Sequence, residues 1–299
     1  MDPFAVYAWF PDGPGPNGEV RQLSPPIGHY WQGCIHPDGT HAVYWGGGIG
    51  TAGVWRTNLD NLRTERLTSM ASTSWHPSYG VAGDRIVFAS DRYGRDLADD
   101  IDVAIERMSS ERGVFHIGGP ESHIFIANED GTLWRALTSG PYHDERPALS
   151  PDNSRAVFVS DRGEPRGLWT VATDEDAVED PTPLAPGTQA YRPWWSVDGE
   201  TIYFFTSIDR RNERLCSVPA SGGEVTTLPA DDRGRSRGPY LDPDGEHLLT
   251  HSDRDGDWKL WEFPLDGGEP RLMQPPGFAM ATHPSRARNG VVFFDAPSP

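Results

Sequence analysis

A short segment that recurs along the whole chain most constrains how this sequence can fold. At residues 146–162 it reads Arg-Pro-Ala-Leu-Ser-Pro-Asp-Asn-Ser-Arg-Ala-Val-Phe-Val-Ser-Asp-Arg, which predicts a short strand, a Pro-Asp turn, a second strand and a polar Ser-Asp-Arg corner. The residue before the turn recurs at His36, His76, Ser150, Ser196, Asp242 and His283. Four of the spacings are 40, 46, 46 and 41 residues and one is 74, so the usual period matches a four-stranded propeller blade.

Further strands complete each repeat. The second strand of each unit is a short apolar run rich in β-branched and aromatic residues, at residues 42–45, 85–88, 156–159, 201–204, 247–250 and 291–294. A third strand is expected at residues 53–56, 123–126, 168–171, 215–218 and 260–263. A leucine marks the fourth strand in the same units: Leu67, Leu137, Leu184, Leu228 and Leu272.

The two ends of the chain each hold half a repeat. Leu23 is a further closing leucine that no complete unit precedes, and the last unit stops after its second strand, near Asp295. The N-terminal segment therefore supplies the outer strands and the C-terminal segment the inner strands of one blade, which removes exposed sheet edges. We predict an all-β fold, a six-bladed β-propeller of four-stranded antiparallel blades, in a single domain over residues 1–299.

The long interval predicts an insertion at about residues 93–122, between the second and third strands of the second blade. Residues 99–108 have the apolar spacing and the N-terminal acids of a helix. This connection opens on the same face as the loops that enter the inner strands. The insertion is therefore expected to lie over the channel mouth as a lid, and the alternative is a surface helix without a role in binding.

Charge and cysteine content exclude several classes of partner. The formal net charge of −18 disfavours nucleic acid and anionic membranes. The two cysteines, Cys34 and Cys216, are too few for a disulfide scaffold or a zinc site. Because the N-terminal residues have the pattern of neither a signal peptide nor a transmembrane segment, a cytoplasmic location is expected.

The repeated motifs are specific enough to compare with known families. The pattern is a proline, an apolar pair, a Ser-Pro-Asp-Gly-like turn, a Ser-Asp-Arg corner and a closing Leu-Thr, as in residues 146–162, 192–199 and 128–138. It resembles the TolB-like (PD40, or WD40-like) β-propeller repeat over nearly the whole chain. The resemblance implies the fold. It implies no single function, because the family includes protein-binding modules, peptidase propellers and, more distantly, lyases that act on sugar acids.

Polar residues gather where the inner strands are expected to begin, four residues before each turn or just ahead of that point. The candidate ligand-binding residues there are Arg146, Arg192, Gln32, Glu145, Tyr191 and Arg237. The planar fork of arginine matches a carboxylate or a phosphate, so an anion-binding pocket at the channel mouth is expected. The alternative is that these arginines pair with Glu145, Asp144 and the corner aspartates and tie the blades together.

Ten histidines raise the question of acid–base or metal chemistry. His36, His76 and His283 are expected to replace serine at the repeated turn, on the face opposite the mouth. His29, His143 and His251 lie nearer the mouth, and His143 and His29 are the candidate catalytic bases. No pair has the spacing of a local metal motif, so neither a metal site nor another cofactor is predicted, and a divalent metal is the weaker alternative.

Two functions remain open at this stage. The first is a soluble binding or scaffolding protein whose channel mouth holds a small anionic or carboxylated molecule, or the end of a peptide or protein partner. The second is a lyase or hydrolase that acts on a carboxylated, uronic-acid-like substrate, with Arg146 and Arg192 on the carboxylate and His143 or His29 as the base. A Gly-x-Ser-x-Gly elbow, which would indicate a serine hydrolase, is absent from the sequence.

Overall fold

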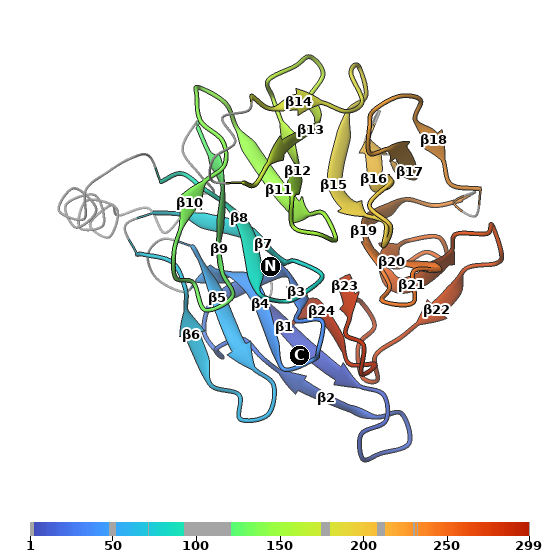
Figure 1. Ribbon diagram of the computed structural model, residues 1–299. Helices are drawn as coiled ribbons and strands as arrows, with labels where there is room; N and C mark the ends of the chain where they lie inside the picture. The colour runs from blue at the N-terminus through green and yellow to red at the C-terminus, as the bar shows by residue number, and fades with distance from the viewer. Residues whose placement is uncertain are drawn as a thin grey trace.

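The computed structural model describes residues 3–47, 52–70, 72–92, 121–174, 180–207, 213–229, 231 and 233–298. These residues form 24 strands in six four-stranded antiparallel sheets, which are arranged as blades around a central channel (Figure 1). The predicted six-bladed propeller is confirmed. In the same residues, no helix is long and apolar enough to cross a membrane.

The first three blades follow one another along the chain. The first contains β3 (His29–Ile35), β4 (His41–Gly47), β5 (Gly53–Asn58) and β6 (Thr64–Arg66). The second contains β7 (Ser74–Tyr79), β8 (Arg85–Ser90), β9 (His123–Asn128) and β10 (Arg135–Ala136). The third contains β11 (Asp144–Leu149), β12 (Arg155–Ser160), β13 (Gly167–Ala172) and β14 (Thr182–Pro183).

The next two blades repeat the same order, with the first strand at the channel and the fourth at the rim (Figure 1). The fourth blade contains β15 (Ala190–Trp195), β16 (Thr201–Ser207), β17 (Glu213–Pro219) and β18 (Thr226–Thr227). The fifth contains β19 (Ser236–Leu241), β20 (His247–Ser252), β21 (Lys259–Pro264) and β22 (Arg271–Met273).

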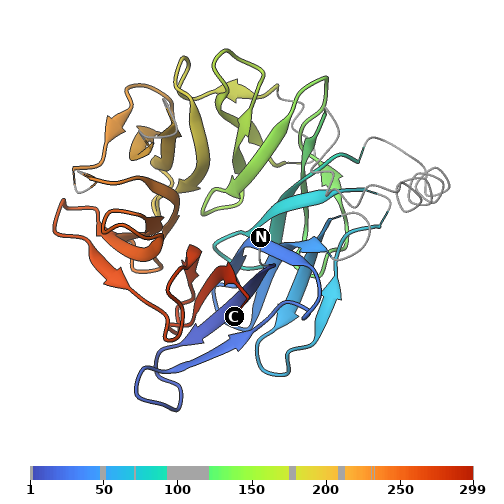
Figure 2. The ribbon, with the colours of Figure 1, turned by 180° about the vertical axis from the view of Figure 1, so that it is seen from behind.

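The sixth blade is shared by the two ends of the chain, as predicted. Its inner half is β23 (Thr282–Arg286) and β24 (Val292–Pro297), and its outer half is β1 (Phe4–Phe10) and β2 (Glu19–Gln22). β24 and β1 pair in antiparallel register from Phe4–Pro297 to Trp9–Val292. Figure 2, seen from behind, shows both ends of the chain within this one sheet. Backbone hydrogen bonds therefore close the ring.

The closing leucines act at the edge of each blade. The backbone N–H of each donates to a carbonyl on the third strand of its own blade, at Leu23, Leu67, Leu137, Leu184 and Leu228. Apolar side chains of the inner strands fill the space between neighbouring blades, and the largest fully buried ones include Trp75, Phe88, Phe158, Phe204 and Phe293. Strands covered on both faces explain why the second strands are continuous apolar runs in the sequence.

The Ser-Asp-Arg corners set where the inner strands begin. Asp91, Asp161 and Asp253 each accept a hydrogen bond, at 2.8, 2.8 and 2.7 Å, from the backbone N–H of the residue that precedes or enters the inner strand of the same blade. The short side chain of an aspartate at a tight turn is suited to accept such backbone N–H bonds, which explains why aspartate recurs at the corners. Each corner therefore fixes the approach of an inner strand to the channel mouth.

Some predicted features lie outside the described residues. The insertion at about 93–122 does so except for its last two residues, and its helix at 99–108 does so entirely. Residues 209–210, where the sequence has a further Asp-Arg corner, and residues 48–50, part of the Gly-Gly-Gly-Ile-Gly corner of the first blade, are outside as well.

Candidate functional site at the channel mouth

Each inner strand is interrupted by a β-bulge at an equivalent position. The pairing between first and second strands shifts register there in all six described blades. One residue at each shift has a positive φ, between 38° and 61°: Gln32, His76, Arg146, Arg192, Gly238 and His283. Proline follows five of these six, and it has no N–H to give to the ladder. The bulges thus present one residue per blade to the channel as a ring, which we call the bulge ring.

The bulge ring corrects the sequence alignment at two histidines. His76 and His283 were expected at the outer turn, but they lie in β7 and β23, at the bulge. The turns of those blades begin instead at Gly80 and Ala287, whose N–H groups bond across the turn as that of His36 does in the first blade. The alignment matched His-Pro to the Ser-Pro of the turn, whereas it corresponds to the Arg-Pro of the bulge.

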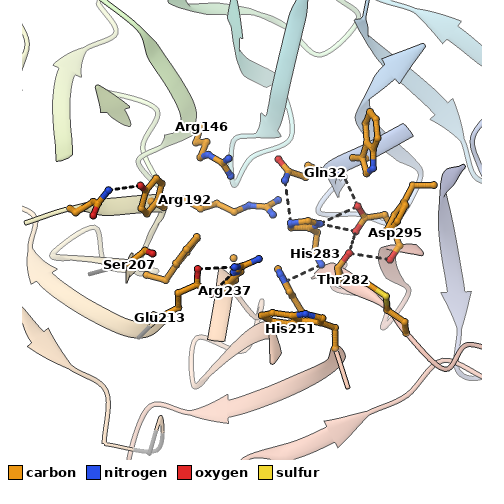
Figure 3. Close-up of a pocket in the computed structure, with 18 residues that line it drawn as sticks. Gln32, Arg146, Arg192, Ser207, Glu213, Arg237, His251, Thr282, His283 and Asp295 are labelled. Carbon is orange, nitrogen blue, oxygen red and sulfur yellow. Dashed lines mark hydrogen bonds and ion pairs between the residues drawn. The ribbon is translucent and has the colours of Figure 1, made fainter. Parts of the chain in front are cut away.

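A cavity of about 690 Å³ opens above the bulge ring (Figure 3). Its charged and titratable wall consists of Arg146, Arg192, Arg237, Glu213, Asp295, His251 and His283. Aromatic side chains border it at Trp31, Tyr191, Phe205 and Trp258. Below the ring, the free space is a second, much smaller pocket of about 30 Å³ that lies between prolines and buried side chains. A small molecule that enters from the mouth therefore meets the ring as the floor of the cavity.

Five of the six predicted ligand-binding residues line this cavity: Gln32, Arg146, Tyr191, Arg192 and Arg237. Glu145 is the exception, because its buried carboxylate lies beside the cavity wall and holds other residues. Glu145 is 3.1 Å from Nε of Arg146 and 3.1 Å from Nη2 of Arg166. These charges hold its pKa well below the usual value against the opposing effect of burial, which is the largest single influence.

The two predicted bases are not brought to the cavity wall. His143 contacts Oγ of Ser122 at 3.0 Å through Nδ1, and its Nε2 lies 3.7 Å from Glu145. His29 stacks on Trp31, with ring centroids 5.4 Å apart. Neither imidazole is among the residues that line the cavity with the arginines, so the pairing of His143 or His29 with Arg146 and Arg192 stays a prediction.

The three cavity arginines differ in how they are neutralised. Arg237 pairs with Glu213, with Nη2 2.7 Å from Oε1, and its guanidinium lies 4.9 Å from the centre of the Trp258 ring. Arg146 has Glu145 as its partner. Arg192 has no carboxylate in contact in the described part of the chain, and its buried Nη1 has no hydrogen-bond partner there. The alternative role expected from the sequence, pairing with acids, therefore applies to Arg237 and Arg146 but not to Arg192.

Burial changes the titration of Arg192 without removing its charge. Desolvation, followed by the repulsion of Arg146, lowers the pKa of its guanidinium to about 10. The side chain is therefore still protonated at neutral pH. A buried cation without a direct counterion is costly in a folded protein, and an incoming anion would relieve that cost.

A histidine–carboxylate pair stands opposite Arg192 (Figure 3). Nδ1 of His283 lies 2.8 and 3.1 Å from the two carboxylate oxygens of Asp295. Asp295 is fully buried, and it also accepts a 2.8 Å hydrogen bond from Oγ1 of Thr282. The other ring nitrogen, Nε2, is 3.2 Å from Nε2 of Gln32. The carboxylate thus fixes the tautomer with Nδ1 protonated and leaves Nε2 as the acceptor.

Sequence reasoning missed the two acids of this wall and did not place His283 there. Glu213 and Asp295 lie near the mouth ends of a third and a second strand, away from the bulge positions at which the repeats align. That position was the available signal, since these strand ends open on the same face as the bulge ring. Among the described residues, no group of three or more histidines, cysteines or acids is arranged to hold a metal ion.

No known family profile matches the chain. An uncharacterised protein of Agrobacterium fabrum is 32% identical over 188 residues, which cover 58% of this chain and 62% of the relative. A TolB homologue of Chlorobium luteolum is 28% identical over 140 residues, which cover 42% of this chain and 32% of the relative. The chain therefore spans less than two thirds of the length of either curated relative.

Solved structures are informative about the fold. A putative TolB from Agrobacterium tumefaciens matches with a TM-score of 0.71 at 15% identity, over 100% of this chain and 99% of that one. The chain has a TolB-like six-bladed β-propeller fold. This TolB-like propeller is also similar to an oligogalacturonate lyase in complex with manganese, with a TM-score of 0.57 at 14% identity over 95% of this chain and 81% of that one. The fold is thus shared by proteins of different function.

Proposed function

We propose that this TolB-like propeller binds a small carboxylated anion, or the carboxylate end of a peptide, in the cavity above the bulge ring. The observation that carries the proposal is Arg192, whose Nη1 is buried without a hydrogen-bond partner and whose guanidinium contacts no carboxylate in the described residues. A ligand carboxylate would supply the missing counterion and two hydrogen-bond acceptors at once. Arg146 is the second donor on the same side of the cavity.

The electrostatics of the cavity support an anionic ligand. The chain as a whole carries a formal net charge of −18, so its surface repels anions at long range. Of the three arginines on the cavity wall, Arg237 pairs with Glu213 and Arg146 with Glu145. Arg192 therefore carries the positive charge that a negative ligand group would pair with.

The size and lining of the cavity favour a small molecule or a chain end over a folded partner. Its volume of about 690 Å³ lies within the usual range of small-molecule sites. Aromatic rings at Tyr191, Phe205 and Trp258 form apolar sides around the charged floor. This combination binds the body of a ligand by contact with the rings and fixes its orientation through the carboxylate.

A test with defined probes uses succinate, L-malate, D-galacturonate and glycylglycine, with D-galactose as a neutral control. Binding is measured by titration calorimetry at neutral pH and low ionic strength. We expect the carboxylated probes to bind and D-galactose not to bind. Arg192→Met should weaken binding by about 10- to 100-fold, because a charged hydrogen-bonded partner is lost. The exposed surface variant Arg288→Met, whose side chain pairs with Asp38, should not change it.

Stability measurements complete this test. Because methionine removes a buried charge that has no direct partner, Arg192→Met should unfold at no lower a denaturant concentration than the wild type. If the variant is folded, a loss of binding is due to the missing guanidinium and not to unfolding. Failure of every carboxylated probe to bind, or equal binding by Arg192→Met, would show that the cavity has another use.

An enzymatic function is the second candidate, and the His283–Asp295 pair is the observation that favours it. The bases expected from the sequence are not on the cavity wall, but this pair is.

A further inference from the structure

His283 has the setting of a proton acceptor for a ligand that Arg192 holds. We infer that Nε2 of His283 takes a proton from the carbon next to the ligand carboxylate, so that the cavity catalyses α-proton transfer in addition to binding. This inference rests on the proposed anion-binding function. It assigns a reaction class to the same site.

The geometry fixes which ring nitrogen faces the ligand. Asp295 holds the Nδ1–H of His283 between its two oxygens, at 2.8 and 3.1 Å. Thr282 and the backbone N–H of Gln32 donate to the same carboxylate, at 2.8 and 3.4 Å, and keep it in place. Nε2 therefore carries the free lone pair and lies on the cavity wall, where the Gln32 amide now occupies the position that a ligand hydrogen would take.

The charge state of the pair suits a base. Burial, followed by the repulsion of Arg192, Arg146 and Arg237, holds the pKa of His283 well below its usual value, so the imidazole is neutral at neutral pH. Desolvation raises the pKa of Asp295 to about 6, which still leaves it ionised there. A bound anion would offset the arginines, and the Asp295 carboxylate would stabilise the imidazolium as it forms.

Contacts around Gly238 bring Arg192 to the histidines. A Cβ at Gly238 would lie 3.1 Å from Nη1 of Arg192 and 3.2 Å from Cε1 of His251. The rings of His251 and His283 are in turn 4.5 Å apart between centroids. The absence of a side chain at Gly238 thus leaves room for Arg192 to cross the ring toward the histidines (Figure 3). A carboxylate on Arg192 would present its α-carbon to this pair.

The proposed step is balanced without any further reagent. The C–H bond beside the carboxylate breaks, its proton moves to Nε2 of His283, and its electron pair is delocalised onto the carboxylate as an enediolate. Arg192 and Arg146 stabilise the added negative charge, which exists only in the intermediate and the states leading to it. The proton then returns from Nε2 to the carbon. In D2O the imidazolium exchanges its proton with solvent, so the carbon regains a deuteron.

The experiment follows α-proton exchange by NMR in D2O, using those of succinate, L-malate, D-galacturonate and glycylglycine that bind in calorimetry. The wild type should exchange the α-proton faster than the protein-free solution. His283→Asn should lower that rate by about 100- to 10,000-fold while the probe still binds. Asparagine is chosen because it tolerates the positive φ of 52° at this position. His247→Asn is the matched control, since His247 also contacts an aspartate, Asp244, at 2.7 Å, but away from the cavity.

A second variant tests whether Asp295 positions His283 for proton transfer or only supports the fold. In Asp295→Asn the carboxylate that fixes the tautomer is gone, so the pH profile of exchange and the ¹⁵N shifts of His283 should both change. Bound probes without exchange in the wild type, or equal exchange in His283→Asn, overturn the inference and leave the binding function intact. Absence of binding overturns the binding function, and this inference with it. Exchange lost in His283→Asn and kept in His247→Asn supports it.

Discussion

Replacing Phe294 by alanine is expected to lower the free energy of unfolding by about 3–5 kcal/mol, since it removes a large side chain from a fully packed site. Phe294 is fully buried in β24, and its ring lies 5.4 Å from that of Tyr7 in β1 and 5.1 Å from that of Phe278. Tyr7 and Phe278 are themselves 4.8 Å apart. The three rings join the N-terminal strand, the C-terminal strand and the loop before β23, so the cavity left by alanine falls where the propeller closes.

The measurement is urea unfolding of the purified variant, followed by tryptophan fluorescence. Ile27→Ala serves as the control, because Ile27 is 79% exposed and its truncation should change stability by no more than about 0.5 kcal/mol. A loss below about 1 kcal/mol for Phe294→Ala would contradict a closure that depends on packing between the chain ends.

The fold was predictable because each blade repeats the same local chemistry. A Pro-Asp turn, an apolar second strand and a Ser-Asp-Arg corner each have a local physical cause, and the period of the repeat adds them into one architecture. Even the shared blade followed, since Leu23 and Asp295 are recognisable as parts of incomplete units. Side chains that every blade needs for folding recur along the chain, so a single sequence is enough to detect them.

The candidate site was predictable only where it coincides with the repeat. Arg146 and Arg192 precede a recognisable Ser-Pro-Asp or Ser-Val-Asp turn at a fixed distance, so the alignment found them. His283 was misplaced because its blade has Ala287 at the turn, and the nearby His-Pro imitated the turn motif. Asp295 ends an apolar strand and is 12 residues from its partner, so nothing local links the two.

The cavity concentrates groups that folding alone would not favour. The partly buried Arg192 has no direct counterion among the described residues, Asp295 is a fully buried carboxylate, and the bulge residues Gln32, Arg146 and His283 have positive φ. Each of these features costs stability, and strained or charged groups of this kind persist where the surrounding structure over-determines them. The closed ring of apolar blades provides that structure.

The cost of one such group should be visible as a pH dependence. Desolvation raises the pKa of Asp295 from 3.8 to about 6 in the folded protein. Its contribution to stability is therefore fully present below the unfolded pKa and is lost as the pH rises through the folded pKa. Between about pH 4 and pH 7 the wild type should lose about 3 kcal/mol of unfolding free energy relative to Asp295→Asn, which cannot ionise there.

Urea unfolding of both proteins across this pH range measures the difference directly. Asp130→Asn gives a control of opposite sign, because hydrogen bonds from Thr132 lower the pKa of the exposed Asp130. Relative to that variant, the wild type should gain stability as the pH rises through the acidic range. If the difference between the wild type and Asp295→Asn did not change with pH, or grew as the pH rose, Asp295 would not be held as a desolvated carboxylate.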